Sequence, residues 1–274
     1  MNITQVYAVY FSATGNTRKV TTTLANALAV SFDVPLEVRD FTLPAAREEA
    51  YEFAAGDLVV FGMPTYAGKL PNKLLDFVKS GFHGNGALAV PVVTFGNRSF
   101  DNSLAELCAC LEGDGFHTIG AGAFACRHAF TDALANGRPD SDDMAELAKL
   151  GSAVVGRIVR MTEYPAPVTV DGDADAPYYR PLGLDGEPKV FLKAKPKTDL
   201  DKCIHCGVCA SLCPMGSINP DDVTEVVGVC IKCHSCVRNC PMGAKYFDDP
   251  AFLSHRAMLE RDYTRRAADK IYTA

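Results

Sequence analysis

Residues 203–218 read CIHCGVCASLCPMGSI, and residues 230–245 read CIKCHSCVRNCPMGAK. The two stretches agree at eight of sixteen positions, which are the four cysteines, one isoleucine and the closing Pro-Met-Gly. Each has the spacing C-x2-C-x2-C-x3-C-P. Runs of this kind supply the thiolate ligands of iron-sulfur clusters. The repeat therefore predicts a chain that carries electrons.

Zinc and disulfides are the alternatives for so many cysteines. Structural zinc sites use separated pairs of ligands around one tetrahedral ion, so the third and fourth cysteines of each run would be surplus. Disulfides need an oxidising compartment, and the start of the chain, MNITQVYAVYF, has no basic stretch that leads into an apolar core. We therefore expect no secretory signal and a cytoplasmic protein.

The spacing resembles that of bacterial two-cluster ferredoxins, in which the fourth cysteine of each run ligates the other cluster. The resemblance implies one [4Fe-4S] cluster on Cys203, Cys206, Cys209 and Cys240, and a second on Cys230, Cys233, Cys236 and Cys213. Three further cysteines, at positions 108, 110 and 126, lack ligand spacing, and we expect them to be small buried residues.

Composition indicates an ordinary globular protein with more than one domain. The chain has 274 residues, of which 48% are hydrophobic and 22% charged, and no apolar run is long enough to span a membrane. A net charge of -6 without a long basic cluster gives no reason to expect nucleic acid as a partner. Since the cluster cysteines all lie between positions 203 and 240, a larger domain must precede them.

That larger domain alternates strands and helices. The hydrophobic pattern predicts strands at residues 3–11, 36–41, 57–63, 87–95 and 118–125, and helices at 18–30, 70–79, 104–112 and 144–161. The strands are too apolar to be half exposed, which indicates a doubly wound α/β domain with a five-stranded parallel sheet. Ligands of such sheets bind beyond the carboxyl ends of the strands.

A polar loop follows the first strand and precedes the first helix. Ser12, Thr14 and Thr17 supply hydroxyls, Gly15 permits a tight turn, and Asn16 lies between them. Together with the N–H groups at the start of the helix, this loop can hold a phosphate. The alternative is a capped helix start without a ligand, since Ser and Thr favour that position. The residues S-x-T-G-N-T resemble the phosphate loop of flavodoxins, which bind FMN.

Two further loops strengthen the resemblance, because both follow strands at the same edge and carry aromatic residues and glycine. In flavodoxin-like proteins such loops enclose the flavin ring, which implies FMN contacts from Pro64, Thr65, Tyr66, Ala67, Gly68, Thr94, Phe95, Gly96, Asn97 and Arg98. The sequence Asn97-Arg98 departs from the acidic loop of many short flavodoxins. For Arg98 two readings stand, a cation that favours the reduced anionic flavin and a solvated loop charge.

As a whole, the chain resembles the flavodoxin-ferredoxin fusion proteins of anaerobes. We therefore expect a flavodoxin-like FMN domain at residues 1–163, a proline-rich connector at 164–199, a small α+β two-cluster ferredoxin domain at 200–250 and a C-terminal helix at 251–274. The aromatic residues of the connector suggest that it packs along the first domain. The loop at 126–140 also resembles that of the family, but its residues indicate no chemistry, and His128 has no assigned role.

Three functional readings remain open. The favoured one is an electron-transfer protein that passes electrons between two [4Fe-4S] clusters and FMN and that has a ferredoxin-like donor or acceptor as its partner. The second is an FMN-dependent reductase of a small acceptor, fed by ferredoxin or NAD(P)H. In the third, the clusters only stabilise a small domain. The sequence identifies no catalytic residue and does not give the direction of electron flow.

Overall fold

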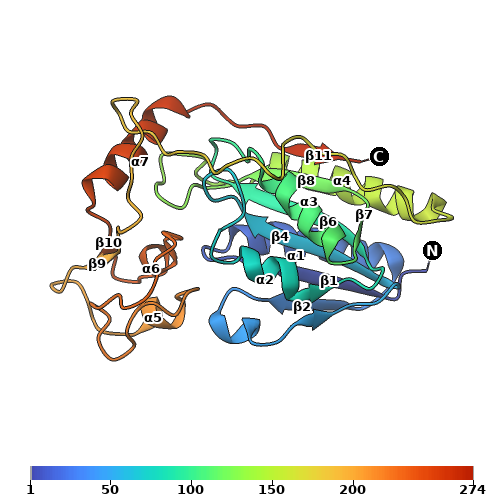
Figure 1. The fold of residues 1–274 in the computed structure, drawn as a ribbon, viewed down its shortest axis with the longest axis horizontal. Coiled ribbons are helices and arrows are strands. Elements are labelled where there is room, and N and C mark those ends of the chain that lie inside the picture. The colour runs from blue at the N-terminus through green and yellow to red at the C-terminus, as the bar shows by residue number, and fades with distance from the viewer. Residues whose placement is uncertain (1, 274) are drawn as a thin grey trace.

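A seven-stranded sheet forms the centre of the computed structural model, which describes residues 2–273 (Figure 1). Its strands are β1 (Gln5–Tyr10), β2 (Leu36–Asp40), β4 (Asp57–Pro64), β6 (Leu88–Phe95), β7 (His117–Thr118), β8 (Ala121–Ala125) and β11 (Lys270–Tyr272). They lie in the order β11-β8-β6-β4-β1-β2, with β7 beside β6. All pairs are parallel except β11 with β8. The predicted α/β fold is confirmed, with β7 and β11 added to the five expected strands.

Helices cover both faces of this sheet. The helices α1 (Asn16–Phe32) and α4 (Ser141–Arg160) pack on one face, while α2 (Leu75–Ser80) and α3 (Ser103–Gly113) pack on the other. Each face has its own apolar core, and every residue of β6 and β8 is buried, as a sheet covered on both sides requires. Within residues 2–273, no helix has the length and apolar character needed to cross a membrane.

The strand order places a crevice at one edge of the sheet. From β1 the chain passes to β2 on one side and later to β4 on the other, so the direction of winding reverses between β1 and β4. At such a reversal the loops after the two strands diverge and leave space beyond their carboxyl ends. The three loops that the sequence assigns to FMN follow β1, β4 and β6, and they meet at this edge.

A short segment beside the sheet completes the first domain. It contains the 3-10 helix η1 (Pro44–Arg47) and two short strands, β3 (Tyr51–Glu52) and β5 (Phe82–His83), which pair in parallel. The rings of Tyr51 and Phe82 stack there at 5.2 Å between centroids. Arg47 reaches the cysteine-rich module from this segment, because its Nη2 donates to the carbonyl of Pro214 at 2.5 Å.

The cysteine-rich module has little regular structure. It contains β9 (Lys197–Thr198), α5 (Val208–Ser211), α6 (Ser235–Arg238) and β10 (Lys245–Tyr246), and β9 pairs antiparallel with β10. The two helices pack against each other and occupy matching places in the two repeats. Each begins after a residue in the left-handed region, Gly207 at φ 74° and His234 at φ 61°. The module is the small α+β unit predicted from the repeat.

The end of the chain differs from the expected closing helix. The helix α7 (Pro250–Asp262) stops at Asp262, and the chain then returns to the main sheet as β11. Buried side chains hold the returning segment: Asn97 donates to the carbonyls of Tyr263 and Arg265, both at 2.7 Å, and Arg138 donates to that of Ala267 at 2.6 Å. Because side chains of the first domain bind these carbonyls, the backbone here needs no helical hydrogen bonds, and the helix can end at Asp262.

The connector lies along the first domain, as its aromatic residues suggested. The hydroxyl of Tyr178 donates to the carbonyl of Leu70 at 2.9 Å. The ammonium of Lys69 donates to the carbonyls of Ala174 and Ala176 and also pairs with Glu106 at 3.0 Å. Because Lys69 is buried, these bonds fix the connector firmly to the domain.

A pH effect on stability follows from Asp114, at the end of α3. Burial raises its pKa to about 6, and its Oδ2 is buried without a hydrogen bond. Since an unfolded aspartate has a pKa of about 3.9, the folded state holds this proton more tightly, and the contribution of Asp114 to stability is lost as pH rises through about 6. We expect Asp114→Asn to be more stable than wild type at pH 8, and this advantage to shrink at pH 5 by about 1 kcal/mol or less, because solvent screens the partly exposed carboxyl.

Urea unfolding followed by circular dichroism at both pH values measures this change. Glu48→Gln, at an exposed position, is the matched control and should show no such pH-dependent difference. An advantage of Asp114→Asn that is equal at pH 5 and pH 8 would contradict the assignment.

Candidate functional site

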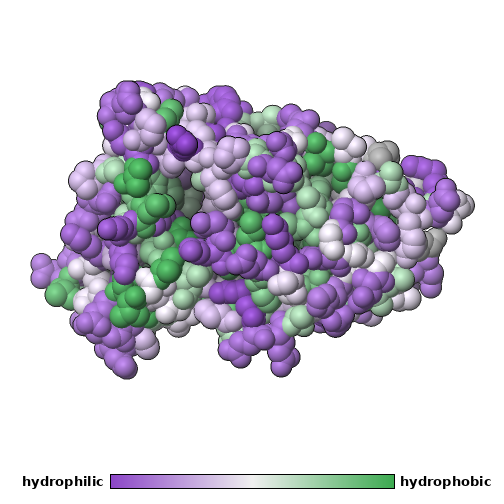
Figure 2. All heavy atoms as spheres, in the orientation of Figure 1, coloured by the Kyte–Doolittle hydropathy of each residue, from purple (hydrophilic) through white to green (hydrophobic). Residues whose placement is uncertain are grey.

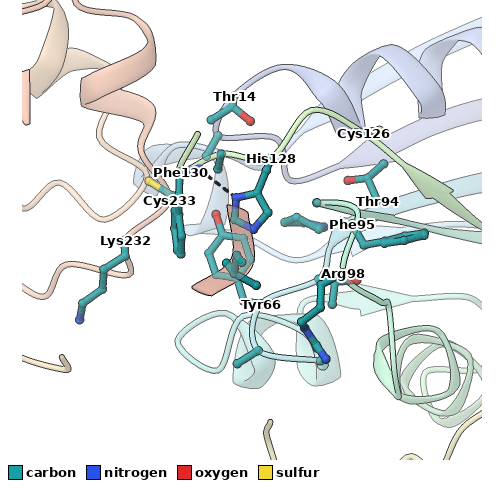
Figure 3. Close-up of a pocket in the computed structure, with 18 of the residues that line it drawn as sticks. Thr14, Tyr66, Thr94, Phe95, Arg98, Cys126, His128, Phe130, Lys232 and Cys233 are labelled. Carbon is teal, nitrogen blue, oxygen red and sulfur yellow. Dashed lines mark hydrogen bonds between the residues drawn. The ribbon is translucent and has the colours of Figure 1, made fainter. Parts of the chain in front are cut away.

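A cavity of about 240 Å³ lies where the loops after β1, β4 and β6 meet; we call it the ring cavity (Figure 3). Twelve of the fifteen residues predicted to contact FMN line it, namely Thr14, Asn16, Thr17, Pro64, Thr65, Tyr66, Ala67, Gly68, Thr94, Phe95, Gly96 and Arg98. Ser12, Gly15 and Asn97 are not among its lining residues. The structure therefore brings the three loops together around one space.

The loop after β1 leads into the start of α1, and several of its polar side chains bond other parts of the protein. Gly15 precedes α1 and has a φ of 90°, a conformation that favours glycine. Because it has no side chain, it forms no side-chain hydrogen bond that caps the helix. Ser12 Oγ instead accepts from the N–H of Arg18 at 3.0 Å, so this serine has a structural role. Asn16 Nδ2 donates to the carbonyl of Arg127 at 3.0 Å. Asn16 and Thr17, in the first turn of α1, line the ring cavity, so a phosphate could bind at the start of this helix.

Tyr66 is held by a tight turn after β4. Its N–H donates to the carbonyl of Lys69 at 2.8 Å, and Ala67 and Gly68 between them have φ values of 50° and 80°. A side chain at Gly68 would also lie 2.5 Å from Asp101, so both space and backbone favour glycine there. The turn presents the Tyr66 ring to the ring cavity, where Figure 3 shows it beside His128.

In the loop after β6, the neighbouring residues Asn97 and Arg98 make different contacts. The side chain of Asn97 is buried and bound to the returning C-terminal segment, so it is engaged away from the cavity. Arg98 lines the cavity, but its guanidinium pairs with Asp101 and lies 3.9 Å from the centre of the Tyr179 ring. The cation is therefore partly neutralised, which weakens the hypothesis of a free positive charge beside the flavin.

His128 is a residue of the cavity that the sequence left without a role. Its ring packs against Gly96, where a Cβ would lie 2.3 Å from Cδ2 of the histidine. Nδ1 accepts from the N–H of Phe130 at 3.1 Å, and burial lowers the pKa of His128 to about 3. The ring is therefore neutral and carries its proton on Nε2. It can donate a hydrogen bond within the cavity but does not supply a proton at neutral pH.

The other walls of the ring cavity come from distant parts of the chain. The connector supplies Tyr179, Pro181 and Phe191, α7 supplies His255 and Leu259, and the second cysteine repeat supplies Ile231, Lys232 and Cys233. The sequence did not indicate these contributions, apart from the aromatic residues of the connector. The parts of the chain that follow the first domain thus complete the walls of the cavity.

The eight repeated cysteines surround two smaller cavities. Cys203, Cys206, Cys209 and Cys240 line the one that we call the outer cysteine cavity, where Cys206 is exposed. Cys213, Cys230, Cys233 and Cys236 line the other, the inner cysteine cavity. Each set joins three cysteines of one repeat with the fourth of the other, as the ferredoxin resemblance implies.

The donor set of each cysteine cavity fits an iron-sulfur cluster. Each has four thiol side chains, and backbone N–H groups donate to sulfurs in both: Ala244 to Cys240 at 3.2 Å, and Ser217 to Cys213 at 3.3 Å. Such bonds stabilise the negative charge of a bound cluster. Burial raises the pKa of the Cys209 thiol, and the nearby charge of Lys245 opposes the rise. Within residues 2–273, no group of three or more His, Cys, Asp or Glu is placed to hold a single metal ion.

The inner cysteine cavity adjoins the ring cavity, because Cys233 lines both. Tyr66 lies close to two cysteines of the inner cysteine cavity, Cys230 and Cys233. Burial raises its pKa well above the usual value, and the thiols of Cys233 and Cys230 raise it further. The loop of the second repeat therefore forms part of the wall around the expected flavin ring.

Arg238 and a group of aromatic rings hold this arrangement together. Arg238 donates to the carbonyls of His128 and Ala129, both at 2.9 Å, and pairs with Asp132 at 2.7 Å. Phe130 packs between His128 and His234, with ring centres 4.9 and 4.8 Å away. These contacts join the loop after β8 to α6, the helix that carries Cys236.

Of the three other cysteines, two are structural and one faces the cavity. Cys108 and Cys110 are buried in α3, and burial raises their pKa values to about 12 and about 11. Both therefore remain neutral thiols. Cys126 is also buried but lines the ring cavity, a placement that its sequence position did not indicate.

Comparisons with known protein families match two stretches of the chain. A flavodoxin domain model matches residues 7–94, and a 4Fe-4S dicluster domain model matches residues 195–241. This is the order of domains in a flavodoxin-ferredoxin fusion, as the sequence predicted. The two domains imply FMN and iron-sulfur clusters as cofactors, and with them an electron-transfer protein that has redox partners.

Solved structures resemble the first domain. An archaeal flavodoxin is 17% identical, with 57% of this chain and 99% of that chain covered and a TM-score of 0.38. The flavodoxin of Streptococcus pneumonia TIGR4 is 16% identical, with 56% and 99% covered and a TM-score of 0.40. The rubredoxin oxygen:oxidoreductase of Desulfovibrio gigas is 14% identical, with 58% and 37% covered and a TM-score of 0.38. No curated protein matches the chain.

The contact between Gly96 and His128 can be tested through FMN binding. In Gly96→Ala the new methyl group must displace the His128 ring, and overpacking of this kind costs about 1–3 kcal/mol. We expect FMN affinity to fall by roughly 5- to 100-fold, measured from the fluorescence of released flavin. Gly113→Ala is the matched control, because a Cβ there meets no atom within 4 Å. Equal FMN affinity of Gly96→Ala and wild type would show that His128 does not shape the cavity.

Proposed function

We propose that this chain, a flavodoxin domain followed by a 4Fe-4S dicluster domain, passes electrons between two [4Fe-4S] clusters and one FMN. One cluster would occupy the outer cysteine cavity and the other the inner one. The FMN would occupy the ring cavity, with its phosphate at the start of α1 and its ring beside Tyr66 and Phe95. The polar loop, the aromatic walls and the two sets of four thiols support this assignment.

The observation that carries the proposal is the position of Cys233, in the walls of both the inner cysteine cavity and the ring cavity. A cluster held by Cys233 would adjoin a flavin bound in the ring cavity. Cys206 of the outer cysteine cavity is exposed. The order of sites is therefore surface, outer cluster, inner cluster and flavin. The position of Cys233 argues against the alternative that the clusters only stabilise a small domain, because a purely structural module has no need to form a wall of the ring cavity.

Iron-sulfur clusters exchange single electrons, whereas FMN accepts one or two, so the three cofactors together would link one-electron carriers to a two-electron step. The protein contributes the walls that separate them from solvent. The connector and α7 supply walls of the ring cavity, and a protein-sized partner would reach the cofactors through the cysteine-rich module. A ferredoxin-like partner would then meet the chain at the outer cysteine cavity.

Surface composition supports that docking position. Large exposed hydrophobic side chains gather on the cysteine-rich module, where Figure 2 shows apolar atoms over the region of α5, α6, β9 and β10. Ile204 and Met242, which are 60% and 46% exposed, also line the outer cysteine cavity. Apolar patches of this kind are typical of protein docking sites.

A second function, reduction of a small acceptor at the flavin, is favoured by one observation. The ring cavity extends past the three flavin loops to Tyr179, Phe191 and Leu259, and His128 presents a hydrogen-bond donor within it. A planar acceptor could bind there against the flavin. Turnover of a quinone, an imine or a nitro compound with NAD(P)H as the sole donor would establish this function in place of the carrier.

The proposal is tested first by cofactor content and by the choice of donor. We expect protein purified without oxygen to contain about eight irons and one FMN. Reduced ferredoxin should bleach both chromophores, and NAD(P)H alone should bleach neither. Absence of flavin, or rapid bleaching of the flavin by NAD(P)H alone, would contradict the carrier function.

The crossed ligand sets make a prediction about pairs of variants. Cys213→Ala should reproduce the electron paramagnetic resonance spectrum of Cys236→Ala, because both remove a ligand of the inner cluster. Cys240→Ala should match Cys209→Ala for the same reason at the outer cluster. Iron content should fall below about eight in all four variants. If Cys213→Ala resembled Cys209→Ala instead, each repeat would hold its own cluster.

Arg238 should control how tightly the module closes on the ring cavity. Arg238→Ala removes two bonds to carbonyls and one ion pair, and a hydrogen bond from a charged group contributes about 1.5–3 kcal/mol. We expect amide exchange in residues 127–132 to accelerate by roughly 10- to 100-fold, and flavin reduction through the clusters to slow. Arg160→Ala, at an exposed position of α4, should change neither quantity. Unchanged exchange in Arg238→Ala would show that other contacts hold the module.

A further inference from the structure

The two cysteine repeats differ at their last position, which is Ile218 in the first and Lys245 in the second. Both residues are buried, with exposed fractions of 4% and 3%. Ile218 lines the inner cysteine cavity and Lys245 the outer one. Equivalent positions of the repeat thus place an apolar side chain in the wall of one cavity and an ammonium group in the wall of the other. The charge of Lys245 acts on Cys209 of the outer set and also on Cys236 of the inner set, so its effect on the two sites differs in degree.

Lys245 has neutral partners. Its Nζ donates to Thr198 Oγ1 at 2.7 Å and to the carbonyl of Val223. Among the described residues, 2–273, no carboxylate forms a salt bridge with it. Asp222 interacts with Lys245 electrostatically but forms no ion pair with it. A buried ammonium without a directly paired carboxylate is costly. The negative charge of a cluster on four thiolates is the compensation that this position offers.

Two cations, Lys232 and Lys195, lie near the inner cysteine cavity, where both act on the Cys230 thiol. The Nζ of Lys195 donates to the carbonyl of Val226 at 2.6 Å, in an exposed position. Lys232 is only half-buried, and its Nζ donates to the carbonyls of Leu192 and Cys230. Figure 3 shows its side chain extending away from the ring cavity and from Cys233. Because water and salt screen an exposed charge more than a buried one, Lys232 should act on its cluster more weakly than Lys245 does.

We propose that Lys245 raises the reduction potential of the outer cluster above that of the inner one, so that the first electron added to the module stays on the outer cluster. The inference rests on the proposed function, because it requires clusters in both cysteine cavities. A fixed cation stabilises the more negative, reduced form of a cluster, and a low-dielectric surrounding strengthens the effect. The electron comes from a one-electron reductant such as a reduced viologen, which is oxidised as the cluster is reduced.

The wild-type protein provides the first test, through paramagnetic NMR of the cysteine β-protons at partial reduction with a reduced viologen. We expect the signals of Cys203, Cys206, Cys209 and Cys240 to move to their reduced positions first. Earlier movement of the signals of the inner set, or simultaneous movement of both sets, would overturn the inference. This measurement needs no variant and is therefore unaffected by folding defects.

A charge series provides the second test. In Lys245→Met the outer cluster should become harder to reduce, by about tenfold or more in the one-electron equilibrium constant, which is a shift of about 59 mV per tenfold. Lys245→Arg keeps the charge and should restore most of the wild-type potential. Lys202→Met is the matched control: Lys202 precedes Cys203 but is exposed and paired with Asp199 at 2.8 Å, so its removal should shift the potential much less.

The outcomes separate this inference from the proposed function. Protein without iron-sulfur clusters or flavin would refute the proposed function. Protein with both clusters and FMN, in which Lys245→Met leaves the outer potential unchanged or shifts it no more than Lys202→Met does, would refute the inference alone. A shift confined to the inner cluster would also refute it.

Discussion

The proposed electron transfer would depend on one contact, the packing of the second cysteine loop against the ring cavity. Cys233 belongs to the walls of both the inner cysteine cavity and the ring cavity. Arg238 fixes this loop to the carbonyls of His128 and Ala129, and Phe130 packs between His128 and His234. Because electron tunnelling falls steeply with distance, these polar and aromatic contacts would decide whether a cluster and a flavin can exchange electrons at all.

The rest of the fold supports this packing. The strand order opens a crevice between β1 and β4, and the buried ammonium of Lys69 ties the connector to the first domain beside it. After α7 the chain returns to the sheet, where Asn97 and Arg138 bind its backbone. The module is therefore held at both of its ends. A ferredoxin unit on a free linker would instead meet the flavin only by diffusion.

The sequence predicted the parts that depend on local patterns. Strongly apolar strands and the cysteine spacing gave the sheet, the module and the loops that line the ring cavity. It could not predict contacts that join distant segments: nothing near Ile231 indicates that it faces the cavity, and the return of residues 270–272 to the sheet depends on Asn97 and Arg138, far away in the chain. Arg98 shows the same limit, because its pairing with Asp101 and stacking on Tyr179 follow from the folded connector.

The order in which the cofactors are reduced tests the central claim most directly. Oxidised protein would be mixed rapidly, without oxygen, with reduced ferredoxin, a donor too large to enter the ring cavity, and the iron-sulfur and flavin absorbances would be followed separately. We predict that the clusters bleach first and that the flavin follows. Bleaching of the flavin before the clusters would contradict a route that runs from the outer cysteine cavity through the inner one to the ring cavity.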